Sequence, residues 1–273
     1  MSLAAAHDLL ACPRCRTPLA VAEREVSCRS GHRFDVARQG YVNLLGTPPP
    51  ANADTPAMLD ARARFLGSGA YDRVAEALVD AVRPGSPREL TVAEAGAGTA
   101  WYLSRVVAAL PSARGVALDV SVAAARRAAG AGPRIASVVA DTWRGLPLLT
   151  RSLDVVLCVF APRHPAEFLR VLKPGGRLVV VHPNAGHLEH LRRTYGLLDV
   201  DPDKEQRLAT QLSDFAVTRH TVAYRVDGTA SQVADLVAMG PNAFHGRVVQ
   251  SAPSRIDVDV SVLVCEAPPA REP

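Results

Sequence analysis

Short apolar runs alternate with amphipathic stretches along most of the chain from residue 90 onward. The runs are almost wholly apolar, which is typical of parallel strands covered on both faces. Between them, apolar residues recur at helical spacing. This alternation predicts a doubly wound, Rossmann-like α/β sheet. The predicted strands are Leu90–Ala95, Ala113–Leu118, Ile135–Ala140, Leu153–Phe160 and Arg177–Val181, and the predicted helices between them are Trp101–Leu110, Val122–Ala129 and Pro165–Val171.

The same reading extends to the C-terminal part. Helices are predicted over Leu188–Leu198 and Thr229–Met239, and strands over Phe215–Val226 and Ile256–Cys265, which would close the sheet. The last residues, 268–273, are proline-rich, so we expect a disordered tail.

The first 89 residues follow a different pattern. Three short strands are predicted over Leu19–Ala22, Glu25–Cys28 and Arg33–Val36, in a unit spanning residues 1–46. Residues 47–57 are polar and proline-rich, which indicates a linker. Helical spacing over Met58–Leu66 and Asp72–Val82 begins a larger domain, residues 58–267.

A metal site is indicated in the first unit. Two cysteines are separated by two residues, a third follows, and a histidine completes the set: Cys12, Cys15, Cys28 and His32. This spacing is typical of a structural zinc site, and a closed set of four protein ligands leaves no open position for catalysis. A redox Cys-x-x-Cys motif is the alternative, but it gives the third cysteine and the histidine no role. We therefore expect a zinc-ribbon-like domain whose small core depends on the metal.

Composition adds compartment and partner class. The formal net charge is +4, which mildly favours a polyanionic partner. The chain shows neither a signal-peptide pattern nor an apolar run long enough to span a bilayer, so we expect a cytoplasmic protein with no membrane segment. The two remaining cysteines, Cys158 and Cys265, are expected to be buried apolar residues. Six arginines crowd the metal unit and fit either a phosphate-binding face or an ordinary solvated surface: Arg14, Arg16, Arg24, Arg29, Arg33 and Arg38.

A cofactor site is indicated where the first long strand meets its helix. Glycines at Gly96 and Gly98 let the backbone approach a ligand there, and the helix N-terminus offers free N–H groups. A dinucleotide motif would need a third glycine where Trp101 stands. The acid Glu94, two residues before the first glycine, instead suits the cationic methionyl end of S-adenosylmethionine. Asp119, at the end of the next strand, suits the two ribose hydroxyls.

Three further segments fit the same cofactor. Asp141 follows the third strand and can accept a hydrogen bond from the adenine amino group, although it can also cap a helix. Phe160, Ala161 and Pro162 close the fourth strand, where the methyl group and its acceptor should meet. Leu172–Gly176 is a turn into the fifth strand. A glycine turn that merely connects a strand to a helix is the alternative to the whole site.

The chain resembles the 23S ribosomal RNA (guanine-N1)-methyltransferases, both the housekeeping enzymes and the tylosin- and mycinamicin-resistance enzymes. The resemblance covers nearly the whole chain. It rests on the four metal ligands with Phe34 and Asp35, on Gly40–Leu45, on Ala61, Arg62, Phe65, Leu66, Gly69 and Tyr71, on the glycine loop, on Leu118–Ser121, Ala161 and Pro162, on Leu172–Gly176, and on His187 and Leu188.

The resemblance implies a class I S-adenosylmethionine-dependent methyltransferase domain behind the zinc domain. It implies structural zinc on the four ligands, and S-adenosylmethionine against Tyr71, Gly98, Thr99 and His187. It further implies a homodimer and a 23S rRNA hairpin near the macrolide site of the peptide exit tunnel as the substrate, with macrolide resistance as one biological role. Ala100 departs from the glycine common at its position in other methyltransferases.

Several alternatives stay open at this point. A small-molecule methyltransferase, for a quinone or a natural product, would share the α/β domain but leave the zinc domain without a role. A non-catalytic zinc- and RNA-binding protein would not need the cofactor loop.

The loop Asn242–His245 is expected to cover a flipped base. The sequence identifies neither the guanine, nor the RNA-contacting residues, nor a base for the N1 proton.

Overall fold

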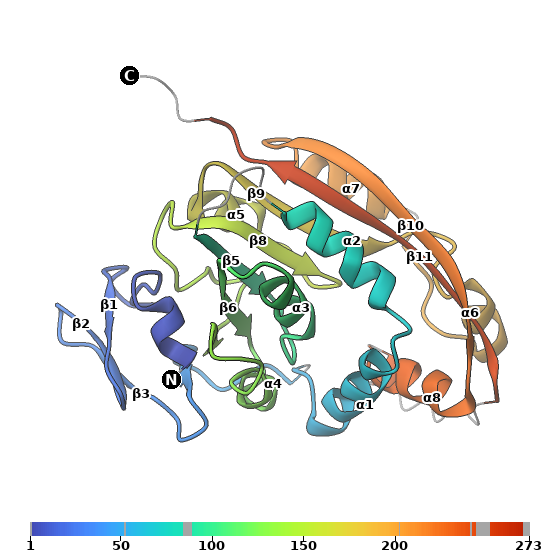
Figure 1. Cartoon of the computed structure of the whole chain (residues 1–273), viewed down its shortest axis with the longest axis horizontal. Helices are drawn as coiled ribbons and strands as arrows, with labels where there is room; N and C mark the ends of the chain where they lie inside the picture. The colour runs from blue at the N-terminus through green and yellow to red at the C-terminus, as the bar shows by residue number, and fades with distance from the viewer. Residues whose placement is uncertain are drawn as a thin grey trace.

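A computed structural model describes residues 2–51, 53–83, 89–201, 203–240, 242–243 and 252–269. Its centre is an eight-stranded sheet in the order β10-β11-β9-β8-β5-β6-β7-β4, and Figure 1 labels its strands from β10 to β6. The six strands from β9 to β4 are parallel, while β11 runs antiparallel to both β9 and β10. The strands are β4 (Tyr41–Asn43), β5 (Leu90–Ala95), β6 (Ala113–Asp119), β7 (Ile135–Val139), β8 (Leu153–Val159), β9 (Leu172–Pro183), β10 (Ala216–Gly228) and β11 (Ser254–Glu266).

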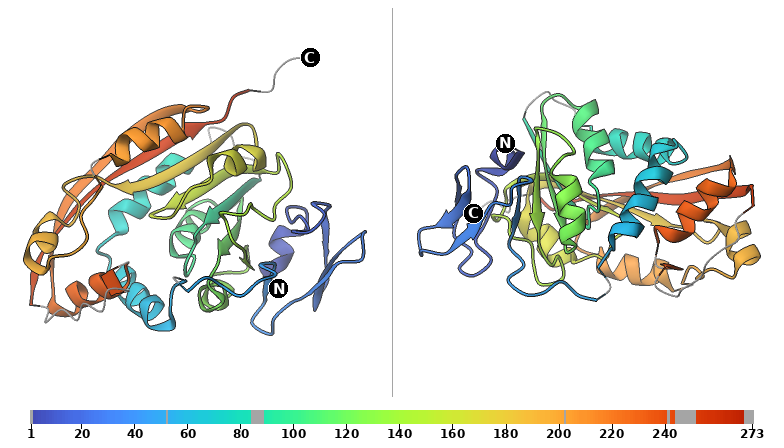
Figure 2. Two further views of the ribbon diagram at one scale, coloured as in Figure 1. Left: turned by 180° about the vertical axis from the view of Figure 1, so that it is seen from behind. Right: turned by 90° about the horizontal axis from the view of Figure 1, so that it is seen from below.

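Residues on the central strands alternate between two cores, one on each face of the sheet. On β8, Val155 and Leu157 face the first core, whereas Val156 and Cys158 face the second. Helices lie on both sides, as Figure 2 shows. The helices are α1 (Pro56–Gly67), α2 (Asp72–Val82), α3 (Trp101–Ala109), α4 (Val122–Ala128), α5 (Pro165–Val171), α6 (Glu189–Tyr195), α7 (Lys204–Gln211) and α8 (Ala230–Ala238). The predicted doubly wound α/β architecture is confirmed.

The N-terminal segment takes the place of a missing helix. No helix is described between β7 and β8, and the 3₁₀ helix η1 (Ser2–Ala6) instead packs against β6 and β7. Leu3 and Leu10 are buried there. The Arg114 guanidinium on β6 holds this segment through two bonds to the Asp8 carboxylate, at 2.6 and 2.7 Å. The first residues of the chain therefore help to complete the second core of the large sheet.

The N-terminal unit contains its own small antiparallel sheet, β1-β2-β3, which lies at one end of the molecule, far from β10 and β11 (Figure 1). Its strands are β1 (Leu19–Val21), β2 (Glu25–Cys28) and β3 (Arg33–Asp35), as predicted within a residue. Leu19 and Val26 are buried in the same core as residues of the large sheet. The small sheet is thus joined to the rest through shared apolar packing.

Three elements differ from the sequence prediction. Tyr41–Asn43, assigned above to the first 46 residues, is strand β4 and pairs in parallel with β7 at the edge of the large sheet. Three residues are too few to show a period, so the pairing could not be inferred. Helix α7 was not predicted because, apart from the buried Leu208, its residues are mainly polar and exposed. The predicted helix over Leu188–Leu198 is shorter, ending before Gly196, which has a positive φ.

The end of the proline-rich segment is anchored to the large domain. The Ser121 hydroxyl donates to the Asp54 carbonyl at 2.8 Å, and Thr55 caps α1 by accepting from Met58 N at 3.3 Å. Within the described part of the chain, no helix has the length and apolar content to cross a membrane.

Candidate functional site

The four predicted metal ligands converge in the small unit. Their ligand atoms all lie within 4.8 Å of one another. The His32 Nδ1 atom is 3.4 Å from the sulfur of Cys12 and 3.4 Å from that of Cys28, and the sulfurs of Cys15 and Cys28 are 3.6 Å apart. Zinc bonds of about 2.3 Å to sulfur and 2.0 Å to nitrogen, at tetrahedral angles, separate ligand atoms by about 3.5–3.8 Å. The predicted quartet therefore fits a tetrahedral zinc ion.

Surrounding groups orient these ligands. The Thr17 hydroxyl lies 3.1 Å from the Cys15 sulfur, and Cys12 is fully buried. All four protein positions are filled by side chains, so this centre stabilises the unit and holds no open site for a reactant. Next to it, Arg16 donates to the Leu146 carbonyl at 3.0 Å. This bond ties the metal unit to the loop that follows β7.

The glycine loop between β5 and α3 needs its glycines for two reasons. Gly96 and Gly98 have φ values of +72° and +55°, in the left-handed region. A Cβ on Gly96 would lie 2.6 Å from the Cβ of Ala161, and a Cβ on Gly98 would lie 2.7 Å from an Arg62 nitrogen. Ala100, also left-handed at +60°, occupies a position that favours glycine. The loop is thus closely packed against both the end of β8 and helix α1.

Asp119 holds this loop in place. Thr99, which follows Gly98 in the chain, is half-buried. One carboxylate oxygen of Asp119 accepts from Gly98 N at 2.7 Å and the other from Ser121 N at 2.8 Å. Burial raises the pKa of Asp119 above its usual range. This contact joins the end of β6 to the loop that follows β5, so the glycine loop and Asp119 lie together. Each carboxylate oxygen retains a lone pair for a further donor.

Glu94 lies beneath the loop and is only 1% exposed. Its Oε2 atom accepts from Leu103 N at 3.1 Å, within the first turn of α3. Because the residue before that helix is Ala100, which has no side-chain oxygen, Glu94 supplies the cap from a distance. Burial raises the pKa of Glu94 to about 8, so the carboxyl is mostly protonated at neutral pH.

Tyr71 and His187 form a buried pair beside Phe160, the residue that follows β8. The Tyr71 hydroxyl lies 3.2 Å from His187 Nε2, and the backbone N–H of Asp259 donates to His187 Nδ1 at 3.3 Å. Burial lowers the pKa of His187 to about 4, so the imidazole is neutral. Because Nδ1 accepts, the single ring proton is on Nε2 and is donated to the tyrosine oxygen. The Tyr71 proton is then free to point to another acceptor.

Phe160 completes an aromatic cluster at the end of β8. Its ring stacks on His187 with centroids 6.0 Å apart and planes at 20°, and it lies 6.2 Å from Tyr71 and 6.3 Å from Tyr102. Its φ is +51°, which is unusual for a bulky side chain. The exposed Pro162 lies two residues further on. Sequence reasoning located this segment but gave Phe160 no role.

Arg62 on α1 is a second residue that sequence reasoning left without a role. Its guanidinium donates to the Asp54 carboxylate at 2.5 Å and to the Met239 carbonyl of α8's C-cap at 2.9 Å. It touches the loop at Gly98, as the glycine geometry above shows. Arg62 therefore joins the linker, α1, α8 and the cofactor loop. Only the tertiary placement of Arg62 beside Gly98 reveals this, and no local pattern encodes it.

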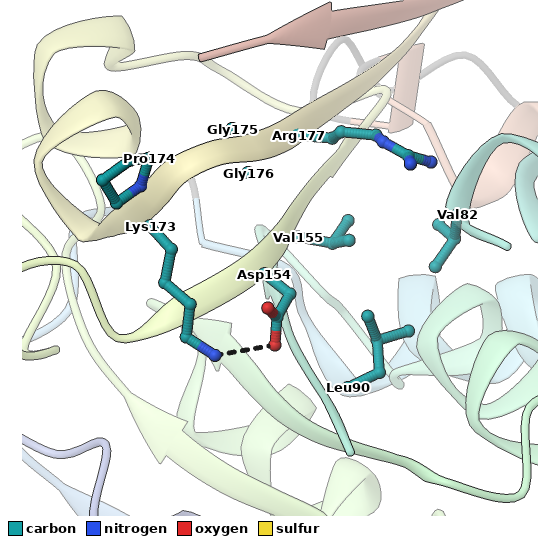
Figure 3. Close-up of a pocket in the computed structure, with 9 residues that line it drawn as sticks. All are labelled: Val82, Leu90, Asp154, Val155, Lys173, Pro174, Gly175, Gly176 and Arg177. Atoms are coloured by element: carbon teal, nitrogen blue, oxygen red, sulfur yellow. Dashed lines mark hydrogen bonds and ion pairs between the residues drawn. The ribbon is translucent and has the colours of Figure 1, made fainter. Parts of the chain in front are cut away.

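The two other predicted segments, Asp141 and Leu172–Gly176, lie at opposite edges of the sheet. Asp141 lies after β7, on the same edge of the sheet as Asp119, and accepts from Trp143 N at 3.0 Å. Its alternative role as a helix cap is wrong, because no helix follows it before β8 in this described stretch. Leu172–Gly176 lies at the opposite edge, where parallel strands begin, and Figure 3 shows Lys173 paired there with Asp154 at 2.9 Å. The segment predicted as a turn is thus the first part of β9, and it is remote from the glycine loop. Phe244 and His245 lie outside the described residues.

Comparison with known proteins matches both parts of the chain. A zinc-ribbon family model described as "RlmA, N-terminal" matches residues 10–49, and one described as "Methyltransferase domain" matches residues 92–176. The 23S rRNA (guanine(748)-N(1))-methyltransferase of Streptomyces fradiae is 42% identical over 95% of this chain and 97% of its own length. A Micromonospora griseorubida protein described by the same class of reaction is 43% identical over 93% of this chain and 91% of its own length.

Solved structures add evidence on the fold alone. The [4+2]-cyclase SpnF aligns with a TM-score of 0.54 at 15% identity, over 79% of this chain and 94% of that one. Phosphoethanolamine N-methyltransferase 2 of Haemonchus contortus, in complex with S-adenosylmethionine, gives 0.52 at 12% identity, over 78% and 57%. Since these two differ in named activity, the shared fold does not settle the chemistry. The zinc quartet, the glycine loop and the full-length relatives together show that the chain belongs to the 23S rRNA (guanine-N1)-methyltransferase family, with a zinc ribbon and a class I methyltransferase domain.

Proposed function

We propose that this protein transfers a methyl group from S-adenosylmethionine to N1 of a guanine in a 23S rRNA hairpin near the macrolide site of the peptide exit tunnel. The observation that carries the proposal is that the zinc unit is packed against the domain that carries the glycine loop. It shares an apolar core with the large sheet, and Arg16 contacts the loop that contains Asp141. Relatives named for rRNA guanine-N1 methylation match nearly the whole chain. Macrolide resistance of the tylosin type is part of the proposal.

The residues at the sheet's carboxyl edge fit S-adenosylmethionine. Asp119 has lone pairs for the ribose hydroxyls, and Asp141 lies on the neighbouring strand for the adenine amino group. The missing Cβ atoms at Gly96 and Gly98 make room for close backbone approach, and Thr99 follows at the opening of α3. When bound, this cofactor supplies an electrophilic methyl group on a sulfonium.

The methionyl end would lie between the loop and Tyr71. Arg62 is the cation against Gly98, and it fits the methionyl carboxylate as a planar, charged donor. Glu94 lies under the same loop and orients α3, while Tyr71, paired with His187, offers its hydroxyl proton. Pro162 would border the acceptor. The main contribution of these residues is alignment, because methyl transfer needs the acceptor nitrogen in line with the methyl group.

A basic surface fits the RNA. All six arginines of the zinc unit are exposed, and Arg33 forms an ion pair with Glu25 at 3.1 Å. Between this unit and the cofactor edge, the loop after β7 exposes Trp143 (63%) next to Arg144. Arginines bind phosphates, and an exposed indole stacks on unpaired bases. A homodimer, in which two zinc units border one cleft, would extend this surface, and the enzyme would act in the cytoplasm on ribosomal RNA.

Tritium transfer tests the proposal. The protein is incubated with methyl-tritiated S-adenosylmethionine and, in parallel, with unmodified 23S rRNA or with a small-molecule extract. We expect label in the RNA, and an Asp119→Ala variant is expected to lose transfer because its cofactor affinity falls. Label appearing only in small molecules would contradict the proposal and favour a natural-product methyltransferase. Failure to bind S-adenosylmethionine in calorimetry would favour a non-catalytic RNA-binding protein.

A further inference from the structure

Phe160 stands at the position where a methyl acceptor has to arrive. It directly follows β8, and its backbone N–H donates to the Val181 carbonyl on β9 at 3.0 Å. The next residue, Ala161, is in contact with the loop at Gly96. Parallel α/β sheets bind their ligands outside the carboxyl ends of the strands. The ring therefore lies beside the cofactor loop, at the reactive edge of the sheet.

The backbone of Phe160 is strained. A left-handed φ of +51° costs an L-residue roughly 1–2 kcal/mol relative to the right-handed region. Strain of this kind persists where the surrounding structure imposes it, and it gathers at functional sites. Here the strain accompanies an orientation: the ring leaves the apolar strand and joins the aromatic cluster, where the residue is still 39% exposed.

The cluster braces this ring on several sides. His187 stacks on it, while Tyr71 and Tyr102 lie tilted against it. His187 is itself fixed by the Asp259 N–H and by Tyr71, so the support is rigid. Phe160 is partly exposed and its ring rests on a rigid support, so it can serve as a platform for another flat ring. Its side chain offers no hydrogen-bonding group, so such a platform binds by stacking and not by reading polar edges.

We propose that Phe160 is the stacking platform for the target guanine. This inference rests on the proposed function. N1 lies on the Watson–Crick edge, so the base must leave its pairing partner before it can accept a methyl group. RNA-binding proteins hold such unstacked bases on aromatic side chains. With the base held on Phe160, its Watson–Crick edge can face the space between Gly96 and Pro162, where the methyl group is expected.

Two substitutions separate stacking from bulk. Phe160→Leu keeps an apolar side chain at the strained position but removes the aromatic face, while Phe160→Tyr keeps the face. Stacking of a base on an aromatic residue contributes about 1–3 kcal/mol, which corresponds to roughly 5- to 150-fold in affinity. We expect Phe160→Leu to lower kcat/KM for the hairpin by that factor and Phe160→Tyr to change it less than threefold. The calorimetric Kd for S-adenosylmethionine should stay within twofold of wild type in both.

A fluorescent base gives a readout that a structural role would not move. The hairpin methylated by the wild-type protein is synthesised with 2-aminopurine in place of the methylated guanine, and its emission is measured on binding. Stacking quenches this base, so the complex with Phe160→Leu should emit more strongly than the wild-type complex at saturation. Equal emission, or a kcat/KM unchanged by the leucine, would overturn the inference. So would a matching loss of S-adenosylmethionine affinity, which would make Phe160 part of the cofactor site.

These outcomes are distinguishable from failure of the proposed function. If the wild-type protein methylates no RNA, both the proposed function and the platform fall. If the wild type methylates the hairpin and Phe160→Leu does so equally well, only the platform falls.

Discussion

Replacing Glu94 with glutamine should change how stability depends on pH. Glu94 is buried with a pKa of about 8, against 4.5 for an ordinary glutamate. The folded protein therefore holds a proton on this group that the unfolded chain releases as the pH rises from about 4.5 to about 8. Because the folded state binds more protons in this window, its stability falls with rising pH. Glutamine has nearly the same shape, keeps an oxygen for Leu103 N–H, and does not titrate.

The magnitude follows from the two pKa values. Each pKa unit corresponds to about 1.36 kcal/mol, so ionising Glu94 in the folded protein costs on the order of 5 kcal/mol. About 3 kcal/mol of this cost develops between pH 5 and pH 8. The stability difference between Glu94→Gln and wild type should therefore grow by about 3 kcal/mol, in favour of the variant, over that range.

Urea unfolding of both proteins at pH 5 and pH 8 measures this difference. Comparing variant with wild type cancels the contributions of other groups, including His187, whose lowered pKa reduces stability as the pH falls below about 6.5. Glu76→Gln, on the exposed face of α2, serves as the matched control and should run parallel to wild type. If Glu94→Gln also runs parallel to wild type, the buried, protonated Glu94 of this account does not exist.

Three further predictions concern the cofactor loop and the metal. Arg62→Gln should weaken S-adenosylmethionine binding by roughly 10- to 150-fold, the value of a charge-assisted bond of about 1.5–3 kcal/mol. The affinity for decarboxylated S-adenosylmethionine, which lacks the carboxylate, should stay within twofold. Equal losses for both ligands in calorimetry, or a similar loss in the exposed control Arg64→Gln, would refute the carboxylate contact. Gly96→Ala should lower the unfolding free energy by about 2–4 kcal/mol through strain and overpacking, whereas Gly67→Ala, with open space around it, should not; two similar urea curves would speak against the close packing on Ala161. Cys28→Ser should reduce the zinc content, measured by mass spectrometry, from one ion per chain to well below one. It should also abolish RNA methylation while S-adenosylmethionine still binds. A full zinc content would show that Cys28 is not a ligand.

The large sheet could be predicted from the sequence because its central strands are nearly continuous apolar runs. The approach of Gly98 to Asp119 followed from topology, since parallel neighbouring strands end at the same edge. The same rule corrects one prediction: Leu172–Gly176 begins β9, and parallel strands begin at the edge opposite the glycine loop. The zinc quartet was predictable because its ligands are close in sequence.

The remaining features depend on tertiary contacts that no local pattern carries. The Arg62 side chain, from α1, lies against Gly98, and η1 packs on β6 and β7, where no helix is described between β7 and β8. The role inferred for Phe160 depends on its backbone φ and on its contacts with three rings that come from distant segments. A sequence places these residues in elements, but the packing of the elements decides which side chains meet.

Nucleoside analysis of the methylated RNA identifies the base and the atom that receive the methyl group. A 23S rRNA hairpin is methylated with labelled S-adenosylmethionine, digested to nucleosides and separated against standards by mass spectrometry. The account predicts that the label co-elutes with 1-methylguanosine, at no more than one methyl group per hairpin. Label in any other nucleoside, or in none, would contradict it.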